Sequence, residues 1–580
     1  MITLTSVQTR AQDADLVNLC RLAHPAAGSG EARHNRLPLP WPTPPQTPPS
    51  PKKQYRSHYR YRGYEKLTDP AVWEYLSPFE IALQLIDFSG LRPVLAQQLG
   101  WQTGRGQIPF DPVSMFLLYG WQITNKWNRA QTLKNLRDPR YADLAAIFGF
   151  ENGVYPTEGG MRYFLTTLGE NSPDNDNAVV VDEETGAMLA RQRLNELIGQ
   201  SVQLILDAGI LSPQAWEKAQ ICPDGMLHEA ASRLRCAHVK AGCYEPTTPG
   251  KPRACPAREK GKQGCACDTL ACASACRFAT LRDADARFVI YSGRNQPENS
   301  PNKPTDPLPS PGQGSDKQKK GRGRAVYGYR SLPLLLVDPQ RRFSVVLADD
   351  FHPANAPEAP PVAAYYKQLS DWYPSLNVDV VSGDAAFGVD SILSIVHNDL
   401  GARRVIDLRA HETDKEPLNW VNRGYDDKGN PLCPFGYRLV ANGYDAQRRR
   451  RKYFCNRVCT QGAVPVIDLE TVPQPPVECP YLASSSQRGF LINVGERFAD
   501  GSIRLVRDVR VGSAAWKELY HRPRNASEGR NAVFEKWRMK RLSVYGQPRG
   551  RATVMVADVW VNLATLARLI REANLVEVPP

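Results

Sequence analysis

The spacing of apolar residues changes along the chain and separates regions of different secondary structure. Between about Trp73 and Asp207, apolar residues recur at intervals of three and four, as in "PVSMFLLYGWQI" and "AQTLKNLRDPRYADLAAIFGF". This spacing predicts several short α-helices. A further helix is expected after Pro156 and Thr157 in "YPTEGGMRYFLTTLG", because proline is favoured in the first turn of a helix. Such a region is compatible with DNA-binding elements and equally with a helical core that binds no ligand.

Beyond Asp207 the pattern predicts strands that alternate with helices. The stretch "AQIC" leads to Pro223-Asp224-Gly225, and two longer stretches, "AVYGYRSLPLLLVD" and "RFSVVLADDF", predict an antiparallel pair joined at Asp338-Pro339-Gln340. We then expect a helix, a strand, a helix, a strand and a final helix. In order, these are Pro361 to Tyr373, "NVDVVSGD", Asp390 to Asp399, "RRVIDLR", and about Asn525 to Met539.

Three strands followed by helix, strand, helix, strand and helix is the order of an RNase H-like fold. In that fold the first and fourth strands lie side by side, so their ends meet at one edge of the sheet. We therefore predict an α+β multidomain protein, with an all-helical N-terminal region and an RNase H-like mixed α/β core that two cysteine-containing insertions interrupt. The expected boundaries are residues 1–66 for an N-terminal region with a proline-rich basic arm, 67–207 for a helical DNA-binding domain, 208–226 with 325–410 and 502–575 for the RNase H-like core, 227–324 for a cysteine-rich and disordered insertion, and 411–501 for a second, basic insertion.

The charge balance of the chain indicates the kind of partner that it binds. Among 580 residues, 73 are Lys or Arg and 60 are Asp or Glu, a net charge of +13 that favours a polyanion such as nucleic acid. The proline-, tyrosine- and lysine-containing segment from Arg36 to Lys66 is interpreted as a linker or as an arm that lies on DNA. The N-terminal residues lack a signal-peptide pattern, and "SLPLLLVD" is too short to cross a bilayer. The sequence thus predicts a soluble, cytoplasmic protein without a membrane partner.

Acidic residues follow two of the predicted strands. Asp224 ends the first strand, Asp384 in "VDVVSGDAAFGVDSIL" ends the fourth, and Glu528 on the final helix is the candidate for a third carboxylate. For Asp384 the alternative is a simple helix cap. Three converging carboxylates would hold two Mg²⁺ ions, for which Mn²⁺ is a substitute, because these cations select oxygen ligands. Such a pair of ions acts on the attacking and leaving oxygens of a phosphodiester, so the expected reaction is phosphodiester hydrolysis and transfer.

Other acids compete for these roles. Asp207 follows the helix-period stretch "LNELIGQSVQLIL", which favours a helix terminus. Asp349 and Asp350 would lie on the third strand, away from the first and fourth, and are interpreted as a solvated edge. Glu535 shares a helical face with Glu528 and is the nearest rival for the third ligand.

The chain contains 13 cysteines, which in a chain of this length indicate metal binding rather than a small secreted disulfide scaffold. Seven of them, between Cys236 and Cys276, fit no standard pair of C-x-x-C motifs and are either Zn²⁺ ligands or buried or free thiols. The second insertion supplies the four thiolates of a possible structural Zn²⁺ site: Cys433, Cys455, Cys459 and Cys479. This site would brace the insertion and hold a basic run against DNA, the alternative for that run being a solvated loop. The run contains Arg448, Arg449 and Arg450.

Several stretches, in order, resemble one family. "LRDPRYADLAAIFGF" and "YPTEGGMRYFLTTLG" are similar to its N-terminal pattern, "CPDGMLHEA" and "GYRSLPLLLVD" to its first-aspartate motif and the next strand, and "GDAAFGVDSIL" to its second-aspartate motif. "WKELYHRPRNASEGRNAVFEKWRMKRLSVYGQPRG" is similar to its glutamate-bearing helix. From about Pro109 to Ala573 the chain resembles the DDE transposases of bacterial insertion sequences.

The resemblance implies a transposase with a catalytic DDE triad of Asp224, Asp384 and Glu528. It would bind the terminal inverted repeats of its element, cleave there, and join the freed 3′-hydroxyl to target DNA. Joining two ends to one target implies a homodimer or a higher assembly, in the bacterial cytoplasm and associated with the nucleoid. The alternatives are a catalytically inactive DNA-binding relative, a Mg²⁺-dependent nuclease that does not join ends, and a zinc-dependent scaffold.

The resemblance also assigns DNA contacts on the glutamate-bearing helix, to Tyr520, Arg522, Arg524 and Lys536. The family spacing places Tyr three residues before Arg and Lys seven after Glu, whereas Tyr520 precedes Arg524 by four and Lys536 follows Glu528 by eight. Arg522 is therefore the alternative to Arg524 for the arginine role.

Overall fold

A computed structural model of the chain describes most of the helical region, the strands after it and the two last helices. The described residues are 39–42, 55–61, 75–99, 108–150, 153–170, 183–231, 283, 285–291, 324–407, 430–433, 436–447, 450–464, 491–495, 509 and 514–576. The cysteines between Cys236 and Cys276, together with Cys479, Arg448 and Arg449, lie outside them.

The N-terminal part of the described chain is helical, as the apolar spacing predicted. Its first helix begins at a capping box in which Ser77 accepts a hydrogen bond from the Glu80 amide and Glu80 bonds back to Ser77. Asp111 caps the next long helix and pairs with Arg92 at 2.8 Å. The helices are α3 (Pro78–Leu85), α4 (Leu91–Gln98), α5 (Pro112–Thr124), α6 (Arg129–Leu136), α7 (Ala142–Phe148), α8 (Glu158–Glu170) and α9 (Glu183–Asp207), with the two-residue strands β1 (Leu39–Pro40) and β2 (Ile86–Asp87) beside them. Asp207 is the terminus of α9, which confirms its interpretation.

A mixed five-stranded sheet forms the centre of the molecule, in the order β11-β10-β3-β7-β8. β3 runs parallel to β10, and β10 runs parallel to β11; β7 is antiparallel to both of its neighbours. The apolar strands are buried because helices cover both faces. The bounds are β3 (Ala219–Pro223), β7 (Leu334–Asp338), β8 (Phe343–Ala348), β10 (Val378–Gly383) and β11 (Arg403–Ile406), preceded by the short helix α10 (Pro213–Glu217).

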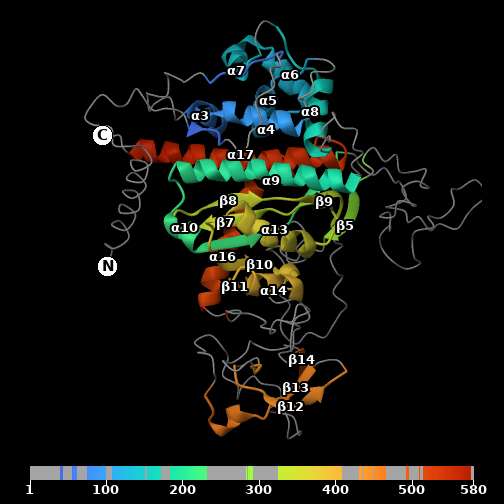
Figure 1. Cartoon of the computed structure of the whole chain (residues 1–580), viewed down its shortest axis with the longest axis vertical. Helices are drawn as coiled ribbons and strands as arrows, with labels where there is room; N and C mark the ends of the chain where they lie inside the picture. Colours follow the sequence, from blue (N-terminus) through green and yellow to red (C-terminus); the bar gives the residue numbers. More distant parts are fainter. Residues whose placement is uncertain are drawn as a thin grey trace, which may run out of the picture.

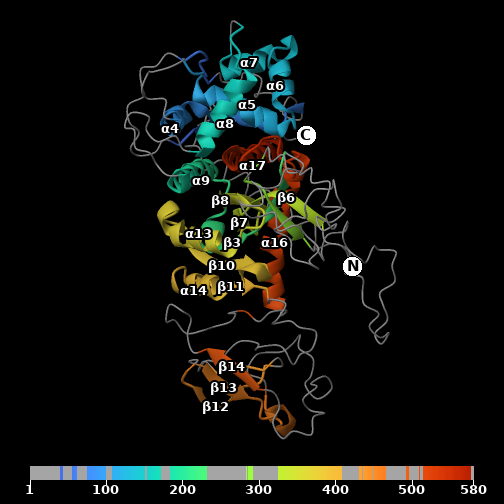
Figure 2. The same ribbon diagram turned by 90° about the vertical axis from the view of Figure 1, so that its right-hand side faces the viewer.

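Figure 2 shows this sheet nearly edge-on, with α13 (Ala359–Trp372) and α14 (Asp390–Asn398) on one side and α16 (Ala514–Lys536) on the other. The final helix was predicted from about Asn525 to Met539, but in the structure it begins earlier, at Ala514. Pro523 lies inside α16, although proline removes one backbone hydrogen bond from a helix. Trp516 and Tyr520, in the additional turns, pack with Val380 and Val405 of the sheet, and this burial favours the longer helix.

One predicted strand, "AVYGYRSLPLLLVD", is two strands in two sheets. β6 (Arg324–Ser331) belongs to a second sheet, and the chain turns at Leu332 and Pro333 before β7 begins in the central sheet. Pro333 has no amide hydrogen to donate, which favours a break in pairing at this point. The second sheet also contains β4 (Met226–Glu229), β5 (Arg287–Tyr291) and β9 (Phe351–Pro353), each paired with β6.

The last helix, α17 (Gln547–Val576), was not predicted as a separate element. It packs against α3 and α8 on one side and against β8 on the other, with α9 alongside it, so that it lies between the helical region and the central sheet (Figure 1). Within the described chain, Gln547–Glu572 is the one stretch long and apolar enough to cross a membrane. Its most apolar window is 78% buried inside the protein, as expected for a core helix.

A separate three-stranded antiparallel sheet lies at the opposite end of the molecule from the helical region (Figure 1). Its strands are β12 (Val440–Asp445), β13 (Arg450–Phe454) and β14 (Leu491–Gly495), in that order. They come from the predicted second insertion, between β11 and α16, and pair with no strand of the central sheet.

Candidate active site

Two aspartates occupy the ends of adjacent parallel strands. Asp224 directly follows β3 and Asp384 directly follows β10, and these strands pair from Ala219 to Ile221 with one register shift between Val378 and Val380. Both side chains are half-buried. Parallel neighbours end at the same edge of a sheet, so the two carboxyl groups lie at one edge, as the sequence predicted.

The alternative role of Asp384 as a cap is also observed. Its Oδ1 accepts a hydrogen bond of 2.9 Å from the Ala386 amide at the start of the single turn Ala385–Phe387. That contact restrains the direction of the side chain. A carboxylate carries about four lone-pair sites, so a cap of this kind leaves acceptor capacity for a further ligand.

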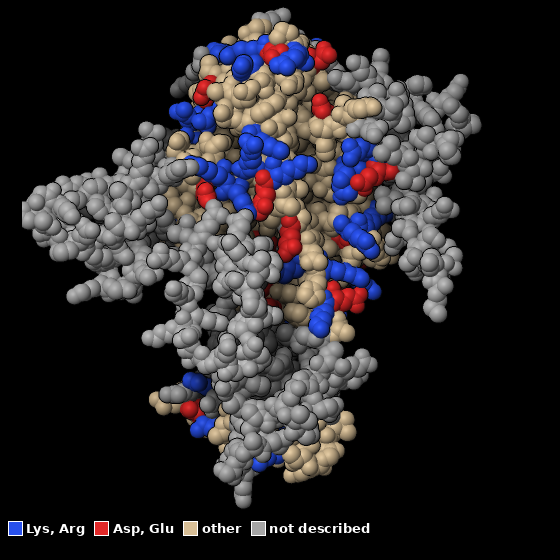
Figure 3. All heavy atoms as spheres, turned by 180° about the vertical axis from the view of Figure 1, so that it is seen from behind, with Lys and Arg blue, Asp and Glu red and all other residues tan. Residues whose placement is uncertain are grey.

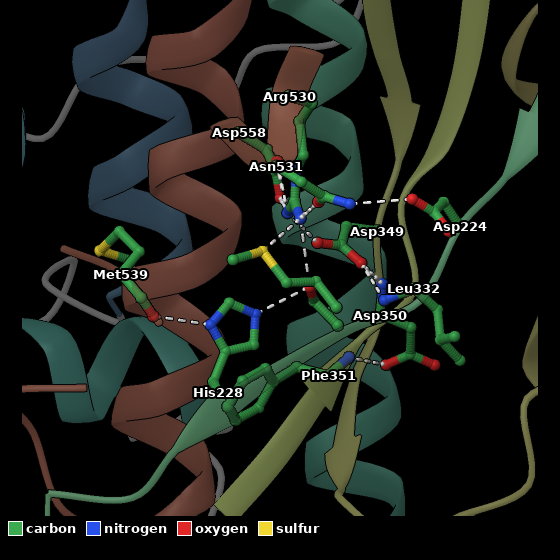
Figure 4. A network of polar contacts seen from close by, with 12 residues as sticks. Asp224, His228, Leu332, Asp349, Asp350, Phe351, Arg530, Asn531, Met539 and Asp558 are labelled. Atoms are coloured by element: carbon green, nitrogen blue, oxygen red, sulfur yellow. Dashed lines mark hydrogen bonds and ion pairs between the residues drawn. The ribbon is translucent and has the colours of Figure 1, made fainter. Parts of the chain in front are cut away.

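Helix α16 brings a side-chain amide to this edge. Nδ2 of Asn531 donates a 2.8 Å hydrogen bond to Oδ2 of Asp224 (Figure 4). Arg524, Glu528 and Asn531 are spaced at four and three residues, which places them on one face of the helix. The face that contacts the strand ends therefore carries a cation, a carboxylate and an amide.

Arg524 is the cation of this face and is half-buried. Burial alone lowers the pKa of its guanidinium, but the neighbouring Tyr520, Asp224 and Asp384 outweigh that effect and raise the pKa above its ordinary value. Arg524 thus stays charged beside both aspartates and offsets part of their repulsion.

A further carboxylate, Glu358 at the start of α13, approaches the same edge. A Cβ atom on Gly225, next to Asp224, would lie 3.3 Å from Oε1 of Glu358. Arg330 pairs with this oxygen at 2.7 Å. Burial raises the pKa of Glu358; Arg330 opposes the rise, and Asp384 and Asp224 add to it. No sequence pattern singles out Glu358, because it directly follows no predicted strand.

The remaining residues assigned to α16 have different environments. Glu528 is exposed, and so are Lys536 and Arg522, the last of which faces Glu518 at 3.5 Å. Tyr520 is buried and stacks on Trp516 with ring centroids 4.1 Å apart. Burial raises the pKa of Tyr520 to about 12. Its ring is part of a packed cluster in which Trp516 is also buried.

The interpretation of Asp349 and Asp350 as a solvated edge is wrong. Both side chains are buried, directly after β8. Asp350 pairs with Arg191 at 2.9 Å and with His352 at 2.7 Å, and Asp349 pairs with Arg530 at 3.0 Å. β8 is separated from β3 by β7, so these acids do lie away from the two strand ends. The pattern placed the strand correctly, but it could not show the cations that face its end.

The carboxylate oxygens of Asp224 and Asp384 at the strand ends match the chemistry of Mg²⁺, which selects oxygen ligands. Asp224 and Asp384 would hold the ion, with Glu528 on the adjoining face of α16. Across the residues that the structure describes, no three side chains of His, Cys, Asp or Glu converge closely enough to form a metal-binding group. The side chain that reaches Asp224 is Asn531, which shares the face of Glu528.

Three of the four predicted Zn²⁺ ligands are described. Cys433 is buried, and Cys455 and Cys459 are half-buried at the end of β13 and after it. The Tyr437 amide donates to Sγ of Cys433 at 3.4 Å. Burial raises the pKa of Tyr437, and Cys459 and Cys433 raise it further, so both sulfurs lie near this ring. Arg450 is half-buried on β13.

Basic side chains gather on the face of the molecule opposite to the view of Figure 1. Figure 3 shows Lys and Arg spread from the helical region down this face, with fewer Asp and Glu among them. Exposed basic residues of the helical region include Lys134, Arg137, Arg140 and Arg162. A surface of this charge is suited to a polyanion.

Comparison with known proteins adds no family to these observations. No family model matches the sequence. No curated protein matches it either.

Proposed function

We propose that the protein is an insertion-sequence transposase that cleaves and joins DNA through Asp224, Asp384 and Glu528. One observation carries the proposal: Asp224 and Asp384 end two adjacent parallel strands, and α16 lays Arg524 and Asn531 against them. The sheet order also supports an RNase H-like core, because the first strand, β3, lies between the fourth, β10, and the second, β7.

Each residue has a role that follows from its chemistry. Asp224 and Asp384 would bind Mg²⁺, or Mn²⁺ in its place, and Glu528 would complete the set. When bound, the two metal ions supply activation of the attacking oxygen and stabilisation of the leaving oxygen at a phosphodiester. Asn531 orients the carboxylate of Asp224, and Arg524 offsets negative charge where a DNA phosphate must approach the acids.

DNA is the proposed partner, both as the terminal inverted repeats of an element and as the target. The helical region and the basic face would bind the repeats, with Arg522, Arg524 and Lys536 contacting phosphates near the cleavage point. Arg448, Arg449 and Arg450 would contact DNA from the second insertion, which Zn²⁺ on Cys433, Cys455, Cys459 and Cys479 would brace. We further propose a homodimer or a higher assembly on DNA, in the bacterial cytoplasm at the nucleoid.

The test uses the full chain, Mg²⁺ and a labelled DNA fragment that carries the sequence flanking the gene. The parent protein should produce strand-transfer products. Asp384→Asn should abolish them and retain binding to the fragment. Asp379→Asn is the matched control, because Asp379 lies on the same strand but pairs with Arg403 at 2.6 Å on the exposed side.

The alternatives give different results. A parent protein that binds the fragment and never cuts it is a catalytically inactive relative. One that cuts without joining is a Mg²⁺-dependent nuclease. Strand transfer by Asp384→Asn at the parental rate would show that the site is misassigned.

A further inference from the structure

A fully buried arginine lies on α16 next to the residues of the candidate active site. Nε and Nη2 of Arg530 donate to the two carboxylate oxygens of Asp558 on α17, at 2.9 and 3.0 Å. Nη2 also donates to Oδ2 of Asp349 at 3.0 Å, and Nη1 to Oγ of Ser331 at 3.3 Å. The guanidinium lies 3.7 Å from the ring centroid of Phe534. Figure 4 shows this network beside the contact of Asn531 with Asp224.

These contacts restrain α16 in rotation about its own axis. Successive residues of an α-helix are about 100° apart, so Asn531 points about 100° away from Arg530. Arg524 precedes Asn531 by seven residues and points within about 20° of it, and Glu528 precedes it by three and points within about 60° of it. A guanidinium held on one side of the helix by β8, β6 and α17 therefore sets the direction of the face that meets Asp224.

The charges of this network indicate that it is built as a unit. Two carboxylates face one guanidinium, and all three side chains have no exposed surface. Burial raises the pKa of Asp349 well above its ordinary value, and neighbouring Asp558 raises it further, outweighing the effect of Arg530. Burial raises the pKa of Asp558 as well, and Arg530 opposes that rise, so one guanidinium is the cation that faces both carboxyl groups. The amides of Leu332 and Asp350 donate to Oδ1 of Asp349, both at 2.7 Å, and fix that side chain in turn.

We propose that Arg530 is a positioning residue for the strand-end site, which fixes the rotation of α16 through Asp558 and Asp349 and so holds Asn531, Arg524 and Glu528 toward Asp224 and Asp384. Because Asp558 lies on α17, which packs on α3, α8 and α9, the same contact joins the site to the helical region. The inference rests on the proposed function, in that the positioned groups are those that would bind Mg²⁺ and DNA.

The test needs a variant that loses the restraint without leaving a buried charge unpaired. The double variant Arg530→Gln with Asp558→Asn removes the guanidinium and its counter-charge together. Arg568→Gln with Glu572→Gln makes the same change in an exposed pair of α17, at 2.9 Å, and is the matched control. Arg530→Lys keeps a charge but cannot form the two-pronged contact with Asp558.

Two measurements are made on the full-length proteins. The first is the MgCl₂ concentration that gives half of the maximal rise in melting temperature, which requires no activity. The second is the rate of strand transfer at saturating Mg²⁺. Replacing a residue that orients metal ligands typically weakens metal affinity by about 10- to 100-fold. We therefore expect the half-saturating MgCl₂ concentration of the double variant to rise by at least about tenfold and its strand-transfer rate to fall by a similar factor. Arg530→Lys should change both in the same direction by less, and the control pair should change neither.

The proposal is overturned if the double variant has parental half-saturation and a parental transfer rate, or if it only melts at a lower temperature with an unchanged response to Mg²⁺. Should the double variant not fold, Arg530→Lys decides the matter by the same two criteria. A parent protein that responds to Mg²⁺ but joins no DNA ends contradicts the proposed function. In that case, comparing the half-saturating MgCl₂ concentrations of the parent and the double variant still tests the positioning role of Arg530.

Discussion

The amide of Asn531 and the carboxylate of Asp224 are joined by a 2.8 Å hydrogen bond, although 307 residues separate them in the chain. The contact links the end of β3 to the C-terminal part of α16. It makes Asn531 a neighbour of the candidate metal ligands, and its neutral side chain can remain there whether Asp224 faces a cation or water.

Replacement of Asn531 should slow strand transfer. Asn531→Ala removes a hydrogen bond to a charged acceptor, a contact worth about 1.5–3 kcal/mol, so a loss of roughly 10- to 100-fold in rate is expected. The measurement is single-turnover strand transfer at saturating DNA. Asn525→Ala, an exposed position on the same helix, is the control. Equal losses in the two variants would contradict a specific role for Asn531.

Removal of the Glu358 charge should weaken the response to Mg²⁺. Glu358→Gln keeps an oxygen for Arg330 but takes away one negative charge near Asp224 and Asp384. The half-saturating Mg²⁺ concentration should rise, by up to about tenfold, which corresponds to about 1.4 kcal/mol. Glu572→Gln makes the same change in an exposed side chain of α17 that pairs with Arg568. A shift of equal size in that control would mean that only overall charge matters.

Close packing of α8 on α17 predicts opposite effects for two glycines of α8. A Cβ at Gly169 would lie 1.9 Å from the backbone oxygen of Pro548, so Gly169→Ala should destabilise the protein by about 1–3 kcal/mol or more. At Gly159 the nearest atom would be Oγ1 of Thr157 at 3.6 Å, and Gly159→Ala should stabilise the helix by about 0.5–1 kcal/mol. Urea unfolding of both variants checks the prediction, which a similar midpoint for the two would refute.

The buried His228 should make stability depend on acid pH. Burial, aided by the positive charge of Arg530, lowers the pKa of His228 from 6.5 to about 3, although its hydrogen bond to the Met539 carbonyl opposes the shift. The unfolded chain therefore binds a proton below pH 6.5 that the folded protein does not accept until about pH 3. The stability from neutral His228 is complete above pH 6.5 and is lost as the pH falls, by up to about 1.4 kcal/mol per pH unit.

His228→Gln isolates this contribution, because glutamine does not titrate. Its free energy of unfolding should fall less steeply than that of the parent between pH 7 and pH 5, as measured by urea titration. Asn398→Gln, at an exposed position on α14 that does not titrate, should keep the parental slope. Parallel curves for the parent and His228→Gln would show that protonation of His228 is not linked to unfolding.

Sequence patterns predicted the parts of the fold that depend on local periodicity. Alternation of apolar runs and helical spacing located β3, β8, β10, β11, α13 and α14 within a few residues. The patterns failed where tertiary contacts decide. Pro523 favours a later helix start, but the buried stack of Trp516 on Tyr520 extends α16 past it. The long apolar α17 has little polar alternation because both of its sides are covered, so it has weak helical periodicity.

The residues of the candidate site also divide into those that local patterns predict and those that only tertiary contacts reveal. Asp224 and Asp384 could be found because each follows an apolar strand, and adjacency of those strands follows from the element order. Glu358 and Arg530 could not, since they reach their neighbours through contacts between elements far apart in sequence. Asn531 had a usable signal, its spacing from Arg524 and Glu528 on one helical face, but spacing does not reveal which side chain of a face touches a strand end.

The position of α16 after the second insertion also determines when the site can form during synthesis. β3 and β10 are made early, and their two aspartates can come together as soon as β10 pairs with β3. Asn531 is translated only after the whole segment between β11 and α16, and Asp558, which holds Arg530, follows still later. A growing polypeptide therefore carries paired strand ends for the time needed to make well over a hundred further residues, and gains an oriented helix only when α17 leaves the ribosome.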